Sequence, residues 1–147
     1  MADKTFELEQ VLMYRREMEK LRKQEFAAAK QGLDRAIHEL NREEELVGLL
    51  TREFQQCQQD IGCIDDIRLY SDFFKRKREE IIQQKEQVEQ LDLIANEKRS
   101  DLMESSKEKK VLESLKEKKT AEFRQEIATK ERNFLDEISI QKKVDPN

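Results

Sequence analysis

The sequence holds few side chains of the kinds that do chemistry. Its single histidine, His38, has no cysteine near it, so it cannot form a His/Cys ligand set with the spacing that zinc sites use. Cys57 and Cys63 have five residues between them, and we interpret them as packing and loop thiols rather than a redox pair. The three glycines are scattered singly and form no phosphate-binding loop. We therefore predict that the chain is no enzyme and takes no cofactor, metal or small-molecule substrate.

The charge pattern also excludes several classes of partner. The formal net charge is −4, and both signs are interspersed along the chain. A nucleic-acid-binding protein would need a net basic surface, so we expect no nucleic-acid partner. The longest apolar run, residues 46–50, is far too short to span a membrane. The N-terminus does not resemble a signal peptide, so we expect a cytosolic protein.

Composition points to long helices. Gly and Pro together make 4 of 147 residues, where average usage would give about 17. Sandwiches, barrels and doubly wound sheets need more turns than this. Charged residues reach 42% and hydrophobic ones only 36%, which leaves little for a globular core. We predict one thin, elongated, all-α domain over residues 1–147.

Two apolar rows with seven-residue spacing predict a coiled coil. The first row is Phe26, Leu33, Leu40, Val47, Phe54 and Ile61, and the second is Ile67, Phe74, Ile81, Val88, Ala95 and Leu102. Gly62 can end a helix between them, and Asp65 or Asp66 can cap the next one. We expect helix 1 at about 5–61, a turn at about 62–65, helix 2 at about 66–141 and a short disordered tail. The prediction is a long two-helix antiparallel hairpin whose second helix is longer, although a parallel dimer stays open.

Both rows fail at charged residues that mirror each other about the turn. These residues are Glu19 on the first arm and Lys109 on the second. Beyond Glu19 the apolar residues of the first arm change frame, with Val11 and Met18 in one short row. Mirroring also leaves roughly the last 20 residues without a partner in the chain, although they carry apolar residues at helical spacing. An exposed apolar stripe of this kind predicts a binding site for a partner. The alternative is self-association through the stripe.

The residues just after the turn form a second candidate surface. Leu69 and Phe73 are four residues apart and share a helix face. A basic cluster follows at Lys75, Arg76, Lys77 and Arg78. The alternatives are packing between the two arms for the apolar pair and a solvated face for the charges.

Three stretches of the sequence resemble the flagellar FliJ proteins. The first is Phe6-x-Leu8-x-x-Val11-Leu12-x-x-Arg15 near the start, and the second is Tyr70-x-x-Phe73-Phe74 after the turn. The third is Lys110-Val111-Leu112-Glu113-x-Leu115-Lys116-Glu117-Lys118, followed by Phe123 and by Asp136-Glu137-Ile138. Their order, the position of the turn and the unpaired C-terminal end together make the resemblance more specific than any one motif.

The resemblance implies a stalk-like component of the flagellar type III export apparatus. Such proteins are similar to the central-stalk gamma subunit of rotary ATPases, and they bind the hexameric export ATPase and the membrane export gate. Some recycle export chaperones. The implied location is cytoplasmic, peripheral at the cytoplasmic face of the cell membrane. A structural coiled-coil spacer and a helical holdase chaperone without an export role remain the alternatives.

The resemblance to the FliJ proteins implies that each end of the hairpin binds one partner. The export-gate end comprises Leu69, Phe73, Lys75, Arg76, Lys77 and Arg78. The ATPase end comprises Phe6, Leu8, Val11, Leu12, Met18, Leu115, Phe123, Ile127, Phe134, Leu135 and Ile138.

Overall fold

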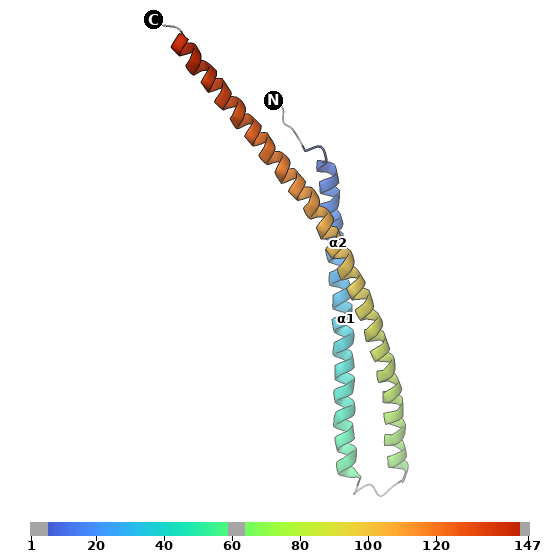
Figure 1. Ribbon diagram of the computed structural model, residues 1–147. Coiled ribbons are helices and arrows are strands. Elements are labelled where there is room, and N and C mark those ends of the chain that lie inside the picture. The colour runs from blue at the N-terminus through green and yellow to red at the C-terminus, as the bar shows by residue number, and fades with distance from the viewer. Residues whose placement is uncertain (1–5, 59–63, 145–147) are drawn as a thin grey trace. The chain divides into compact units, whose positions relative to one another are not determined.

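The computed structural model describes residues 6–58 and 64–144 and contains two helices (Figure 1). Helix α1 spans Glu9–Cys57 and helix α2 spans Ile64–Val144, with lengths of 49 and 81 residues. The two helices pack against each other in opposite directions, and the described ranges contain no strand. The predicted antiparallel hairpin with a longer second helix is confirmed.

The helix ends differ from the predicted ones by a few residues. α1 begins at Glu9, whose backbone N–H donates to the Phe6 carbonyl at 3.0 Å, and it ends at Cys57. α2 begins at Ile64, two residues before the predicted start, and runs to Val144. Of the predicted turn, Ile64 and Asp65 are therefore helical, while Gly62 and Cys63 lie outside the described residues. The carboxylates of Asp65 and Asp66 lie in the first turn of α2, where the helix dipole favours negative charge.

The chain forms two compact units through which both helices run. The turn unit consists of residues 21–103, and the terminal unit consists of residues 1–20 and 104–147. Each unit contains one segment of α1 and one of α2.

The turn unit is held together by the predicted seven-residue rows. Leu40 and Ala95 are buried, and the other described row residues are half-buried, except for Ile67, which is exposed. The positions three residues after each row member are half-buried as well, among them Ala36, Leu50 and Leu91. Two positions in seven therefore face the other helix, which is the spacing of a coiled-coil seam. The last residue predicted for the first row, Ile61, lies outside the described residues.

An aromatic cluster closes the seam near the first turns of α2. The ring of Phe54 from α1 lies 5.1 Å from Tyr70 and 6.0 Å from Phe74, measured between ring centroids. The Phe54–Phe74 contact is edge-to-face, a geometry that the charge distribution of aromatic rings favours. Tyr70 and Phe74 are thus packing residues between the two arms.

In the terminal unit the buried frame does not change, contrary to the sequence prediction. Seven-residue steps back from Phe26 reach Glu19 and then Leu12, and both are buried. Seven-residue steps on from Leu102 reach Lys109 and Lys116, and both are half-buried. Glu19 and Lys109 form an ion pair at 2.9 Å. A charge can occupy a seam position when an opposite charge on the other helix meets it, so the rows continue where their apolar character ends.

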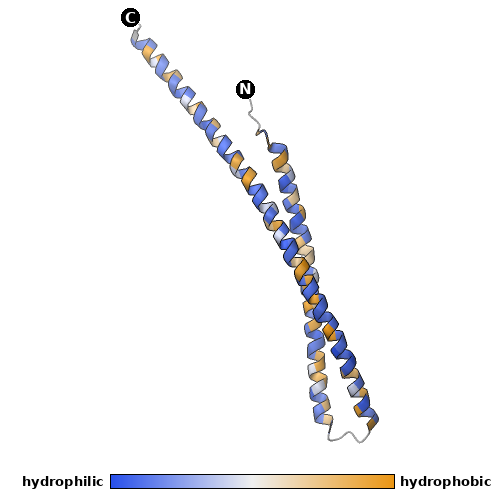
Figure 2. Cartoon of the chain, turned by 45° about the vertical axis from the view of Figure 1, so that its right-hand side comes forward, coloured by the Kyte–Doolittle hydropathy of each residue, from blue (hydrophilic) through white to orange (hydrophobic). Residues whose placement is uncertain are grey.

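Apolar residues are thinly spread along both helices. Figure 2 shows mostly hydrophilic ribbon, interrupted by single hydrophobic residues. Leu12, Leu40 and Ala95 are the buried hydrophobic side chains among the described residues. The narrow seam therefore buries little apolar surface for its length.

The glycines inside α1 give a direct test of how helix propensity limits stability. A methyl group added at Gly48 would meet nothing within 4 Å. Glycine in a helix interior costs roughly 1 kcal/mol relative to alanine. We expect Gly48→Ala to raise the free energy of unfolding by about 1 kcal/mol, measured by chemical denaturation. Arg52→Ala, on the same exposed stretch, should change it by only a few tenths of a kcal/mol, since arginine is already a good helix former. Lower stability of Gly48→Ala would contradict the open environment of that residue.

Candidate partner-binding surfaces

Each unit carries one of the predicted surfaces. The eleven residues predicted for the ATPase end, from Phe6 to Met18 and from Leu115 to Ile138, all lie in the terminal unit and are called the terminal surface. The six residues predicted for the export-gate end, from Leu69 to Arg78, lie in the turn unit and are called the turn surface.

Leu12 is inaccessible within the terminal surface. Its side chain is fully buried in the seam, so a partner could touch it only after the two helices separate. Leu8 and Val11 are exposed, while Phe6 and Met18 are half-buried. Leu115 from α2 is half-buried too. The N-terminal half of the surface is therefore partly used for packing within the chain.

The C-terminal part of α2 presents most of the accessible apolar area. Between Ala121 and Lys143 the side chains are exposed, apart from Phe123 and Ile138, which are half-buried. Phe134 and Leu135 are 62% and 63% exposed, and Ile127 is 41% exposed. Ile127 and Phe134 are seven residues apart and Ile138 follows four later, so these three side chains share a helix face.

Among the described residues of the terminal unit, four ion pairs join α1 and α2 within a short length. Glu9 pairs with Lys116 at 2.8 Å, and Arg15 pairs with Glu108 at 2.5 Å. The others are Arg16–Glu113 at 3.3 Å and Glu19–Lys109 at 2.9 Å. Glu19–Lys109 lies within the seam, whereas the other three pairs are more exposed. Because exposed ion pairs contribute little and are screened by salt, those three add only a small, salt-dependent stabilisation.

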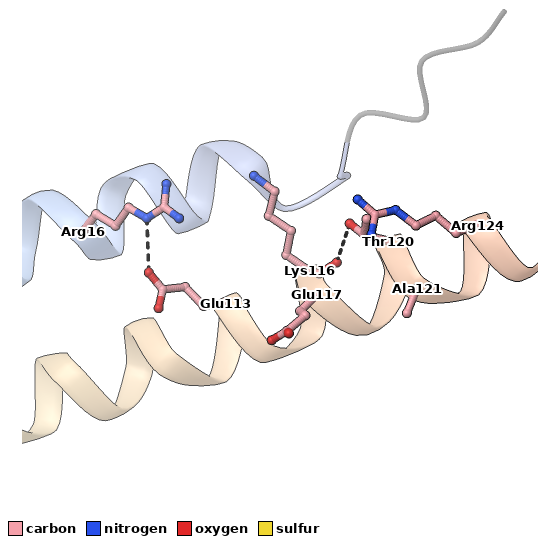
Figure 3. Close-up of a pocket in the computed structure, with 7 residues that line it drawn as sticks. All are labelled: Arg16, Glu113, Lys116, Glu117, Thr120, Ala121 and Arg124. Atoms are coloured by element: carbon pink, nitrogen blue, oxygen red, sulfur yellow. Dashed lines mark hydrogen bonds and ion pairs between the residues drawn. The ribbon is translucent and has the colours of Figure 1, made fainter.

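A shallow open groove lies beside these pairs (Figure 3). Its lining side chains are Arg16, Glu113, Lys116, Glu117, Thr120, Ala121 and Arg124. Arg16 reaches across from α1 to Glu113, and the Thr120 hydroxyl donates to the backbone carbonyl of Lys116 at 2.9 Å. Six of its seven lining residues are polar or charged, so the groove adds no large apolar side chain to the terminal surface.

The turn surface keeps its hydrophobic and most of its basic members accessible. Leu69 is 68% exposed, and Lys75, Arg76 and Arg78 are exposed as well. Phe73 is half-buried, and its ring lies 5.9 Å from that of Phe74 in the seam. Phe73 therefore both packs within the hairpin and borders the outer surface.

Lys77 does not join the exposed basic cluster. Its side chain is only 19% exposed, and its ammonium lies 2.9 Å from Glu43 and 3.1 Å from Glu80. Hydrogen bonds to Glu43 and Glu80 raise the pKa of Lys77. The ammonium also lies 5.8 Å from the Phe73 ring centroid. Lys77 lies three residues after Phe74, and this seam position was the signal in the sequence for its burial.

Other exposed apolar residues escaped the sequence prediction. Ile64, the first residue of α2 in the turn unit, is 76% exposed. In the terminal unit, Ile140 is exposed beyond Ile138. These residues lie off the seven-residue rows, so periodicity carries no signal for them.

The described ranges give no sign of a membrane span or metal centre. Neither α1 nor α2, as far as each is described, contains a run apolar enough to cross a bilayer. The same residues contain no group of three His, Cys, Asp or Glu side chains placed to hold a metal ion.

Comparison with known families gives a match that covers nearly the whole chain. A family model described as "Flagellar FliJ protein" matches residues 4–144. Searches of curated proteins and of solved structures gave no match.

Glu25 of the turn unit gives an acid-range test of the charged contacts. A hydrogen bond from Arg22 is the largest cause of its lowered pKa, and Lys98 at 3.7 Å also lowers it. A carboxyl whose pKa is lower when folded stabilises the fold above its unfolded pKa, here near 4.5, and loses that contribution as the pH falls through the folded value. We expect the wild type to lose more stability than Glu25→Gln when the pH is lowered from neutral to below 4.5, measured by thermal unfolding. Glu89→Gln, at an exposed position, should follow the wild type. Parallel curves for all three proteins would contradict the assignment.

Proposed function

This chain belongs to the flagellar FliJ protein family, and from that premise we propose that it acts as a stalk that inserts its terminal surface into the hexameric flagellar export ATPase. Family membership makes it a component of the flagellar export apparatus that interacts with other export components. The family is a structural part of that apparatus and is not known for enzyme activity.

The observation that carries the proposal is the exposed apolar face of α2 beyond Phe123. Ile127, Phe134 and Ile138 share one side of the helix, and charged residues such as Arg132 and Asp136 lie on the opposite side. An amphipathic helix of this kind fits an apolar groove or collar on a partner. Burying such side chains would contribute about 1.5–3 kcal/mol each before the cost of ordering.

In this proposal the chemistry stays in the ATPase. The chain supplies no catalytic group and instead changes how readily the ring assembles or turns over. It can do so only by binding one state of the ring more tightly than another, since a ligand with equal affinity for both states shifts nothing.

Removing the exposed end of α2 tests the ATPase contact. A chain that stops after Glu126 keeps Phe123, which is half-buried, and loses Ile127, Phe134, Leu135 and Ile138. We expect it to lose stimulation of a purified export ATPase while keeping its thermal unfolding transition nearly unchanged, because most of the side chains removed are exposed. The measurements are phosphate release and circular dichroism.

A point variant separates apolar contact from helix length. Phe134→Ala combined with Ile127→Ala should reduce stimulation strongly, whereas Thr129→Ala combined with Arg132→Ala should leave it almost intact. Full stimulation by the truncated chain at equal concentration would mean that this end of α2 is not the stalk tip.

The turn surface is our proposed site for the membrane export gate. Exposed Leu69 and half-buried Phe73 give it an apolar part, and Lys75, Arg76 and Arg78 give it positive charge. Such a surface suits a partner that offers an apolar pocket with acidic residues at its rim. Contact with the gate would hold the chain peripherally at the cytoplasmic face of the membrane.

Substituting Phe73 tests this site against a purely structural role. We expect Phe73→Ala to weaken binding to the purified gate protein and to lower the melting temperature only modestly, because the Phe73 ring packs against Phe74 of its own helix, whereas the Phe74 ring contacts Phe54 of α1. Phe74→Ala is the matched control, since it removes the same ring from the seam and should lower the melting temperature much more. Intact gate binding by Phe73→Ala with a large loss of thermal stability would assign Phe73 to the packing of the hairpin.

A further inference from the structure

Charged residues occupy seam positions where apolar residues would be expected. In the turn unit, Glu43 and Lys77 each lie three residues after a row member, and their side chains meet at 2.9 Å. In the terminal unit, Glu19 and Lys109 lie in the rows themselves and also meet at 2.9 Å. The side chains of these four residues are 27%, 19%, 9% and 21% exposed, so all of them face the other helix rather than solvent.

Other polar groups support both pairs. The Ser106 hydroxyl donates to the Glu19 carboxylate at 2.8 Å, and Glu80 lies 3.1 Å from the Lys77 ammonium. Of the three side chains that are buried among the described residues of the terminal unit, only Leu12 is apolar, while Glu19 and Ser105 are polar. The seam is therefore polar at particular positions along its length. At these positions a charge on one helix faces an opposite charge on the other.

The stability of the hairpin does not explain these charges. Replacing a buried ion pair with well-packed apolar residues is often neutral or stabilising, because the charges lose hydration when they are buried. A polar residue at a seam position is known to select one register or one partner at a cost in stability. Charges in the seam can therefore disfavour alternative pairings of the helices.

A parallel, in-register pair of chains is the pairing that they penalise most directly. In such a pair each seam residue faces the same residue of the other copy. Glu43 would meet Glu43 and Lys77 would meet Lys77, and the same holds for Glu19 and Lys109. Like charges facing each other at a seam are repulsive and partly desolvated. The antiparallel fold within one chain instead places opposite charges together at both levels.

We propose that Glu43–Lys77 and Glu19–Lys109 are specificity elements that make parallel, in-register pairing with a second copy of the chain repulsive, so that the antiparallel hairpin is favoured over a parallel dimer. They also fix the register of the hairpin. A slip by one heptad would place Lys77 opposite Ala36 or Leu50 and leave its charge unpaired in the seam. This inference concerns self-recognition and does not depend on the proposed export role.

The double variant Glu43→Leu/Lys77→Leu of the full chain tests the proposal. It removes the charges at one position along the seam, where like charges would face each other in a parallel pair, and puts apolar residues there. We expect the variant to keep its helical content and to show a concentration-dependent rise in mass from monomer to dimer by light scattering, while the wild type stays a monomer over the same range. Glu19→Leu/Lys109→Leu should behave in the same way at the second level.

Two controls separate the seam charges from added hydrophobicity. Glu44 and Lys85 form a pair at 3.5 Å with 43% and 59% exposed side chains, so Glu44→Leu/Lys85→Leu makes the same replacements outside the seam. We expect this variant to stay monomeric. The exchange Glu43→Lys/Lys77→Glu keeps opposite charges within the hairpin and like charges in a parallel pair, so it should stay monomeric too.

The outcomes are decisive in each direction. Dimers of the two seam variants alone support the proposal. A seam variant that stays monomeric at all concentrations overturns it, and so does dimerisation of the Glu44/Lys85 variant to the same degree. Loss of helical content in the seam variants also overturns it, because the charges would then be needed for folding rather than for partner choice.

Discussion

The narrow seam between α1 and α2 is the constraint on which the rest of the molecule depends. A coiled coil offers two positions in seven for burial, and here several of those positions carry charge. Among the described residues, the buried hydrophobic side chains are Leu12, Leu40 and Ala95. The stabilising free energy is therefore spread thinly over many turns, and small contributions such as helix propensity and ion pairing carry unusual weight.

The same constraint separates the residues that hold the hairpin from those that remain available. Apolar residues within the seam are consumed by packing, as Leu12 and Phe74 are, and cannot also meet a partner. Apolar residues off the seam stay exposed because a two-helix layer has no second face on which to bury them. Leu69 in the turn unit and Phe134 in the terminal unit are of this kind. A component of an assembly benefits from this division, because partner contacts can change without unfolding the chain.

Part of each candidate surface followed from the sequence and part did not. The exposed end of α2 was predicted because Phe134 and Ile138 lie beyond any residue that the first arm could supply. Lys77 was grouped with its basic neighbours, although its ammonium is held in the seam by Glu43. Leu12 was assigned to the ATPase end, although its side chain is fully buried in the seam. The frame change predicted at Glu19 treated a charged residue as the end of the seam, when Lys109 on the other helix allowed the seam to continue.

The seven-residue spacing by itself determined two long helices and which of their residues face the seam, whereas the antiparallel pairing was favoured over a parallel dimer only by the mirrored ends of the two rows. The spacing could do so because the helical period fixes which side chains share a face, whatever their neighbours are. Only the tertiary structure decided which charged residues lie in the seam and which off-row residues stay exposed. Whether Glu19 breaks the seam or continues it depends on what lies opposite, and Lys109 lies ninety positions away in the sequence. The structure likewise leaves Ile67 exposed although it belongs to a row. The local sequence pattern fixes which side chains share a helix face. The side chain that lies opposite on the other helix decides whether each position stabilises the seam.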